Sequence, residues 1–149
     1  MSVDRSTGIA VAGPEDFRDT RIRVDFVGGE EYAVRMRGHQ VPTDQPADNG
    51  GADRGPSPVE LFVASMAACT AYYAGRYLDR HHVAREGLRV FAGYRMAADR
   101  PARVERVRLD VRVPDGTPGE LLRGLHAVVS HCTVHNTLRQ QPEIDIDIS

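Results

Sequence analysis

Residues 55–70 read GPSPVELFVASMAACT, and the fold can be reasoned outward from this stretch. Ser57 is a favourable N-cap, Pro58 suits the first helical position, and Glu60 falls at the third, where it completes a capping box. The following residues are apolar on every side of a helix, which is typical of a helix buried in a core or an interface. The stretch therefore predicts a buried helix, and Cys69 places one thiol in its middle.

This helix is expected to run from Pro58 to about Arg80, roughly 30 Å at 1.5 Å per residue. Its last turns become charged through Arg76 and Asp79, so we expect that end to emerge into solvent. The apolar surface is wider than one sheet can cover. A second copy of the chain is the simplest way to bury the remainder, which predicts a symmetric homodimer.

Alternating polar and apolar residues precede the helix and predict a small antiparallel sheet. The runs 21–26 and 32–37 alternate with a period of two, and two consecutive glycines between them suit a hairpin turn. Residues 39–43 add a short third strand. The Asp-, Pro- and Gly-rich residues 44–55 predict a surface loop that leads to the helix.

The second half of the chain repeats the alternation and adds another helical stretch. We predict strands over residues 88–94 and 107–113. Thr117 and Glu120 read as a second capping box, after which apolar residues recur at helical spacing as far as Cys132. Cys132 is therefore expected to point towards the core, like the first thiol.

The chain is expected to pause near Cys132, restart a helix at Thr133 and end it at Pro142. The alternating residues 143–148 predict a last strand. Strands with one polar face and two capped helices favour an α+β fold class, with antiparallel sheets packed on two core helices.

Length and composition are those of one globular domain. A chain of 149 residues can bury a core, so we assign residues 21–149 to a single domain and expect residues 1–20 to form a flexible N-terminal arm. The net charge of −2 argues against binding to nucleic acid or to an anionic membrane, both of which attract positively charged surfaces. The apolar helix is short and begins with Glu60, which argues against a membrane span. The sequence has only two cysteines and does not open with the charged and apolar pattern of a signal peptide. We therefore expect a cytoplasmic protein rather than a secreted, disulfide-rich one.

The two thiols are the candidates for chemistry. Cys69 and Cys132 each lie on the apolar face of a predicted helix and could meet in the folded chain. Such a pair suits peroxide chemistry: one thiolate becomes a sulfenic acid, the other condenses with it to a disulfide, and an external thiol restores the pair. Two core cysteines without chemistry are the alternative, because buried free cysteine is common.

Reactivity requires a thiolate, which a nearby cation or hydrogen-bond donor stabilises. Cys69 sits in the middle of its helix, so we expect an arginine from another element to supply the cation. Tyr72 and Tyr73 lie about one turn further along and are interpreted as core or interface aromatics rather than acid–base groups.

A metal site is a further alternative at the second thiol. His131, Cys132 and His135 are spaced like metal ligands, and Cys69 could provide a fourth. The same two histidines would also stabilise a thiolate at Cys132. We expect no metal in the main hypothesis.

Three stretches resemble the OsmC/Ohr family: GPSPVELF at 55–62, AACT at 67–70 and CTVHNTL at 132–138. The resemblance covers nearly the whole chain from about Arg21, because the order of strands and helices also agrees. It implies an OsmC-like fold, an intertwined homodimer with thiol sites at the subunit interface. It also implies reduction of organic hydroperoxides without a cofactor, with Cys69 peroxidatic, Cys132 resolving and a dithiol, often a dihydrolipoyl group, as reductant.

Two positions depart from the organic-hydroperoxide-resistance branch of that family. The branch has an Arg after two glycines that follow its first strand, where this sequence has Glu30. It also has a catalytic Glu directly after the helix proline, where this sequence has Val59. The activating Arg–Glu pair is therefore not carried over, and the sequence resembles the OsmC-like branch more. Arg54 is our candidate for the cation, and Glu60, which the capping box already explains, is the candidate acid.

The sequence thus predicts a thiol-dependent peroxide reductase that detoxifies organic hydroperoxides in oxidative stress. The alternative is a non-enzymatic OsmC-like dimer that binds a small hydrophobic ligand or senses oxidants, and the missing Arg–Glu pair motivates it.

Overall fold

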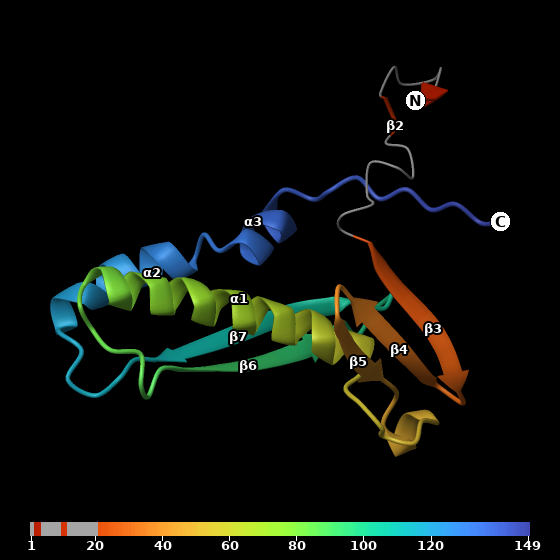
Figure 1. Ribbon diagram of the computed structural model, residues 1–149, viewed down its shortest axis with the longest axis horizontal. Helices are drawn as coiled ribbons and strands as arrows, with labels where there is room; N and C mark the ends of the chain where they lie inside the picture. The colour runs from red at the N-terminus through yellow and green to blue at the C-terminus, as the bar shows by residue number, and fades with distance from the viewer. Residues whose placement is uncertain (1, 4–9, 12–20) are drawn as a thin grey trace. The chain divides into compact units, whose positions relative to one another are not determined.

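The computed structural model describes residues 2–3, 10–11 and 21–149 (Figure 1). The chain falls into two compact units, Met1–Pro58 and Val59–Ser149, and each is described by itself. Strands β1 (Ser2–Val3) and β2 (Ala10–Val11) pair antiparallel, and the rest of the expected N-terminal arm lies outside the described residues. Across the described ranges, none of the helices is long and apolar enough to span a membrane. The single domain over 21–149 stays a prediction.

The first unit contains a three-stranded antiparallel sheet in the order β3 (Ile22–Gly28), β4 (Glu31–Met36) and β5 (His39–Thr43). Val34 of β4 lies opposite apolar residues of both neighbouring strands, so the predicted alternation is in register across the sheet. Gly29 adopts a φ of +57° in the β3–β4 turn, a conformation that favours glycine. The three predicted strands and their hairpin are confirmed.

Helix α1 spans Pro58–Arg80, as the sequence predicts. Its buried residues mostly recur every three or four positions and form one face: Val63, Met66, Thr70, Ala74, Gly75 and Leu78. Elsewhere on the helix Phe62 and Tyr72 are 38% and 57% exposed. Within one chain the expectation of a wholly buried helix therefore holds for one face only.

The second unit packs this helix with a β-hairpin and two shorter helices. Strands β6 (Arg89–Met96) and β7 (Val104–Arg112) pair antiparallel, and α1 lies along them (Figure 1). Helix α2 (Leu122–Val129) lies beside α1, where the Tyr77 hydroxyl donates to the Leu121 carbonyl at 3.1 Å. Helix α3 (Thr133–Arg139) follows after the predicted break at Cys132. The observed architecture is α+β, as expected.

The predicted second capping box is wrong. The Thr117 hydroxyl donates to the carbonyl of Pro114 at 2.7 Å instead of capping a helix. A short 3₁₀ turn, Gly119–Leu121, comes next, with Pro118 at its N-cap and no side-chain cap, and only then does α2 begin. The hydroxyl donates back to a carbonyl three residues earlier, as commonly happens with Ser and Thr at turns, and Thr117 is not the N-cap of a helix.

The predicted last strand is also wrong for the single chain. Residues 140–149 form no helix or strand, and Ile144, Ile146 and Ile148 are 78%, 80% and 95% exposed. Alternation gives a segment two different faces, but a strand also needs a neighbouring strand for its backbone hydrogen bonds. The pattern therefore specifies a strand whose pairing partner the described chain does not provide.

Candidate thiol site and neighbouring cavity

The two cysteines lie on separate helical segments of the second unit, and both are free thiols. Cys69 is in the middle of α1 and is partly exposed. Cys132 is fully buried and forms the N-cap of α3 with extended backbone, but its side chain makes no capping hydrogen bond. An external oxidant can therefore reach Cys69 more readily than Cys132.

A hydrogen bond joins the two segments that carry the thiols. The hydroxyls of Tyr73 and Thr133 are 2.8 Å apart. Tyr73 lies four residues after Cys69, so both side chains project from the same side of α1, about 6 Å apart along the helix axis. Thr133 directly follows Cys132 in the chain. This geometry places Cys69 on the side of α1 that faces the start of α3.

Further contacts fix the turn before α3. His131 donates from Nδ1 to the carbonyl of Ala127 at 2.8 Å, and Asn136 donates from Nδ2 to the carbonyl of His131 at 3.1 Å. In the part of the chain that the structure describes, no three residues among His, Cys, Asp and Glu are placed to hold a metal ion. The metal alternative at His131, Cys132 and His135 therefore gains no support.

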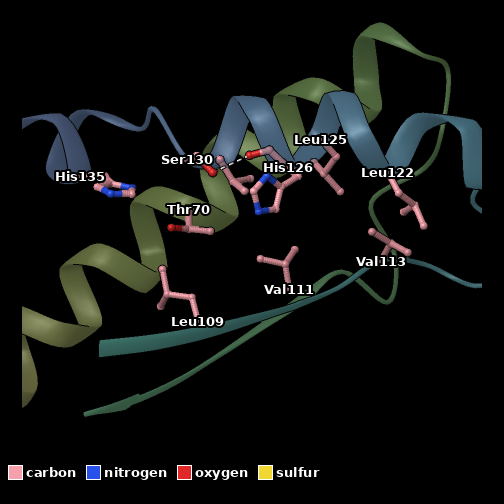
Figure 2. A pocket seen from close by; sticks show the side chains of 10 residues that line it. Thr70, Leu109, Val111, Val113, Leu122, Leu125, His126, Ser130 and His135 are labelled. Atoms are coloured by element: carbon pink, nitrogen blue, oxygen red, sulfur yellow. Dashed lines mark hydrogen bonds between the residues drawn. The ribbon is translucent and has the colours of Figure 1, made fainter. Parts of the chain in front are cut away.

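A cavity of about 460 Å³ lies between α1, α2, α3, β7 and the residue after β7 (Figure 2). Most of its wall is apolar and comes from Leu109, Val111, Val113, Leu122, Leu125 and Val129. Its polar lining residues are Thr70, His126, Ser130 and His135. Figure 2 shows Thr70 and His135 towards one end and Leu122 and Val113 towards the other. Neither thiol belongs to the described lining.

One polar group at this cavity lacks a hydrogen-bond partner among the described residues. The Thr70 hydroxyl is buried and unpaired, whereas the Ser130 hydroxyl donates to the carbonyl of His126 at 2.7 Å. Sequence reasoning did not identify this cavity. The available signal was Thr70 itself, a hydroxyl four residues after Met66 on the buried face of α1.

The two predicted supporting residues lie near the start of α1. Glu60 occupies the first turn of the helix and is exposed. Arg54 is exposed in the preceding loop, and its Nε lies 3.7 Å from a carboxylate oxygen of Glu31. The capping box and the activating roles of Glu60 and Arg54 stay predictions.

A carboxylate that the sequence did not single out organises the same loop. Asp44 is 1% exposed and accepts hydrogen bonds from the backbone N–H groups of Gln45, Ala52 and Arg54 at 2.8–3.2 Å. The Arg54 N–H makes the largest contribution to holding the pKa of Asp44 below its ordinary value. The loop that leads into α1 is thus built around a buried anion.

Solved structures of the same fold come from several bacteria. A Psychrobacter arcticus protein named for osmotic stress induction and detoxification response is 22% identical, with a TM-score of 0.72 over 78% of this chain and 85% of that chain. An OsmC-like protein from Mycoplasma pneumoniae is 15% identical, with a TM-score of 0.71 over 83% and 89%. An organic hydroperoxide resistance protein from Elizabethkingia anophelis is 21% identical, with a TM-score of 0.62 over 81% and 89%. At these identities the likeness concerns the fold.

No curated protein sequence matches the chain significantly. The sequence model of the OsmC-like protein family matches residues 50–147, well over half of the chain. This match and the shared fold confirm the resemblance carried by the two cysteine motifs. The chain belongs to the OsmC-like protein family.

Proposed function

We propose that the protein is a thiol-dependent reductase of organic hydroperoxides, with Cys69 and Cys132 as its redox pair and a role in the oxidative stress response. The hydrogen bond between Tyr73 and Thr133 carries the proposal, because it ties together the two segments that hold the free thiols. The fold supports it, since one similar structure is that of an organic hydroperoxide resistance protein.

Cys69 reacts first, because its side chain is partly exposed whereas Cys132 is buried. Its thiolate attacks a peroxide oxygen: an S–O bond forms, the O–O bond breaks, and the alkoxide takes up a proton and leaves as the alcohol. Two electrons pass from the sulfur to the peroxide. Cys132 then attacks the sulfenic sulfur, so that an S–S bond forms and the hydroxyl leaves with the thiol proton as water. An external dithiol reduces this disulfide by thiol–disulfide exchange, and we propose a lipoyl dithiol for this step.

The proposal assigns Arg54 as the cation that stabilises the Cys69 thiolate. Glu60 is assigned as the acid that supports this arginine. It places the protein in the cytoplasm, where free thiols persist. It also includes a homodimer, supported by the exposed apolar side chains of both units, among them Phe26 and Tyr72.

Turnover with an alkyl hydroperoxide tests the thiol chemistry. Purified protein is mixed with cumene hydroperoxide and dihydrolipoamide, and peroxide loss is followed. We expect Cys69→Ser to lose at least 100-fold in rate. Cys132→Ser is expected to form the sulfenic acid at the wild-type rate and then fail to form the disulfide. The proposal would be refuted if the wild type consumed peroxide no faster than Cys69→Ser.

The cavity favours a second candidate function, the binding of a small aliphatic molecule. Its volume falls within the usual range of roughly 300–1,000 Å³ for ligand pockets. No Arg, Lys, Asp or Glu belongs to the described lining, so no permanently charged side chain there would balance the charge of an ionic head group. A neutral oxygen head group suits the site better, because the unpaired hydroxyl of Thr70 can both donate and accept.

Calorimetry with 1-octanol as the probe tests this candidate. We expect Thr70→Val, which keeps the side-chain shape, to weaken binding about fivefold through the loss of one hydrogen bond. Thr137→Val is the matched control, because that hydroxyl donates to the carbonyl of Thr133 outside the cavity. Cys69→Ser should bind the alcohol like the wild type, which separates this candidate from the redox proposal. Equal affinities of the wild type and Thr70→Val would contradict it.

A further inference from the structure

We propose that Tyr73 is a positioning residue for the resolving step: its hydroxyl holds the Cys132 segment against α1 while Cys69 is a sulfenic acid. This inference rests on the proposed redox function. It concerns the second step of the reaction, the closure of the disulfide, and leaves the attack on peroxide untouched.

The contacts of Tyr73 fix the phenol at the junction of two helices. Its hydroxyl meets that of Thr133, the first residue of α3, at 2.8 Å. Its ring packs edge-on against Tyr72, with ring centroids 5.6 Å apart and planes at 85°. A short, oriented link thus runs from α1 to the side chain of Thr133, the residue that follows Cys132. Any separation of Thr133 from α1 would carry that thiol with it.

The position of Cys69 makes this link relevant to its sulfur. Cys69 and Tyr73 are four residues apart and share one side of α1, so the side that holds the start of α3 is also the side on which the sulfenic acid forms. Disulfide closure requires Cα atoms about 4.4–6.8 Å apart. Because Cys132 is the N-cap of a helix that begins with Thr133, a tether at Thr133 limits how far the second thiol can withdraw.

The chemical consequence is a competition between two fates of the sulfenic acid. Attack by Cys132 gives the disulfide and water, whereas a second hydroperoxide molecule adds another oxygen, is itself reduced to the alcohol, and leaves a sulfinic acid. Holding Cys132 close favours the first fate. Loss of the tether is therefore expected to slow disulfide closure and raise the sulfinic fraction, without changing the first oxidation.

Tyr73→Phe removes only the hydroxyl and keeps the ring. Rapid mixing with cumene hydroperoxide, followed by dimedone trapping and mass spectrometry, measures sulfenic, disulfide and sulfinic forms separately. We expect sulfenic acid formation within twofold of the wild type and disulfide closure slower by about two- to tenfold, the effect of one lost hydrogen bond. Thr133→Val should give the same slowing, and the double variant no more than either single one.

Tyr72→Phe is the matched control, a neighbouring phenol that is 57% exposed, and it should close the disulfide at the wild-type rate. If wild-type Cys69 is not oxidised at all, the proposed function fails. If Cys69 is oxidised normally but Tyr73→Phe closes the disulfide as fast as the wild type, this inference alone is overturned. Equal slowing of both steps would assign Tyr73 a general structural role and would also overturn it.

Discussion

Asp44 is a buried carboxylate that holds together a loop of the first unit. Its carboxylate accepts three backbone hydrogen bonds that close the loop between β5 and α1. Gly51 approaches so closely that a Cβ there would lie 1.8 Å from the carbonyl oxygen of Gln45. Since an unpaired backbone N–H in such a loop would be costly, the charge of Asp44 and the closed loop depend on each other.

The charge of Asp44 predicts an acid-sensitive part of the stability. Hydrogen bonds, first of all from the Arg54 N–H, hold its pKa below the ordinary 3.8, so folding favours the ionised form. The contribution of ionised Asp44 to the free energy of unfolding is therefore fully present above the pKa of Asp44 in the unfolded chain. It is lost as the pH falls through the lower pKa of Asp44 in the folded protein. We expect Asp44→Asn to lower the urea midpoint at pH 7, with a difference from wild type that shrinks below pH 3.8.

Asp48→Asn provides the control, because Asp48 is exposed in the same loop. The urea midpoint of this variant should equal that of the wild type at each pH from 3 to 7. A deficit for Asp44→Asn that stays constant over this range would show that the side chain acts through its shape rather than its charge.

The thiols were predictable at the residue scale, whereas their surroundings were not. The helix break that isolates Cys132 follows from local sequence and is confirmed. The partner of Tyr73 lies 60 positions away, and nothing near Tyr73 in sequence specifies it. The same holds for Asp44, because a polar loop does not reveal which N–H groups will converge on its one buried carboxylate.

Elements defined by local chemistry were predicted well. The bounds of α1 follow from Pro58 at its start and a charged end, and the strands follow from alternation with glycine turns. The capping box at Thr117 failed because the Thr117 hydroxyl donates to the carbonyl three residues earlier, that of Pro114, and does not cap the N–H groups that follow it. Local patterns therefore place elements, but they do not decide between two competing local hydrogen bonds.

The packing contacts between elements could not be predicted from local sequence patterns. A Cβ at Gly124 of α2 would lie 2.3 Å from the hydroxyl oxygen of Tyr77 on α1, so the tip of that side chain packs into the space that the glycine leaves open. In the sequence Gly124 is only a poor helix former inside an apolar stretch. The cavity behind Thr70 arises in the same way, from the spacing of three helices and one strand, and no single segment encodes it.

The whole molecule carries more apolar surface than one chain covers. In the first unit Ile22, Val24 and Phe26 are 58%, 54% and 66% exposed on an edge strand. In the second unit the C-terminal isoleucines are exposed in the segment that the sequence predicts as a strand. Exposed apolar edge strands invite pairing with another chain. A second copy would supply both the missing strand partner and the cover for the open face of α1.

Association is expected to depend on the apolar face of residues 143–148. Replacing Ile144, Ile146 and Ile148 together by Thr keeps β-branching but removes about 1–2 kcal/mol of burial per side chain. The dimer dissociation constant should then rise at least about 100-fold, because each 1.4 kcal/mol is a factor of ten. Sedimentation velocity over a concentration series measures this. The matched variant changes the alternate face, Glu143→Gln with Asp145→Asn and Asp147→Asn, and should stay as dimeric as the wild type. A wild type that sediments as a monomer at 100 μM, or equal dissociation constants for the two triple variants, would refute pairing through this segment.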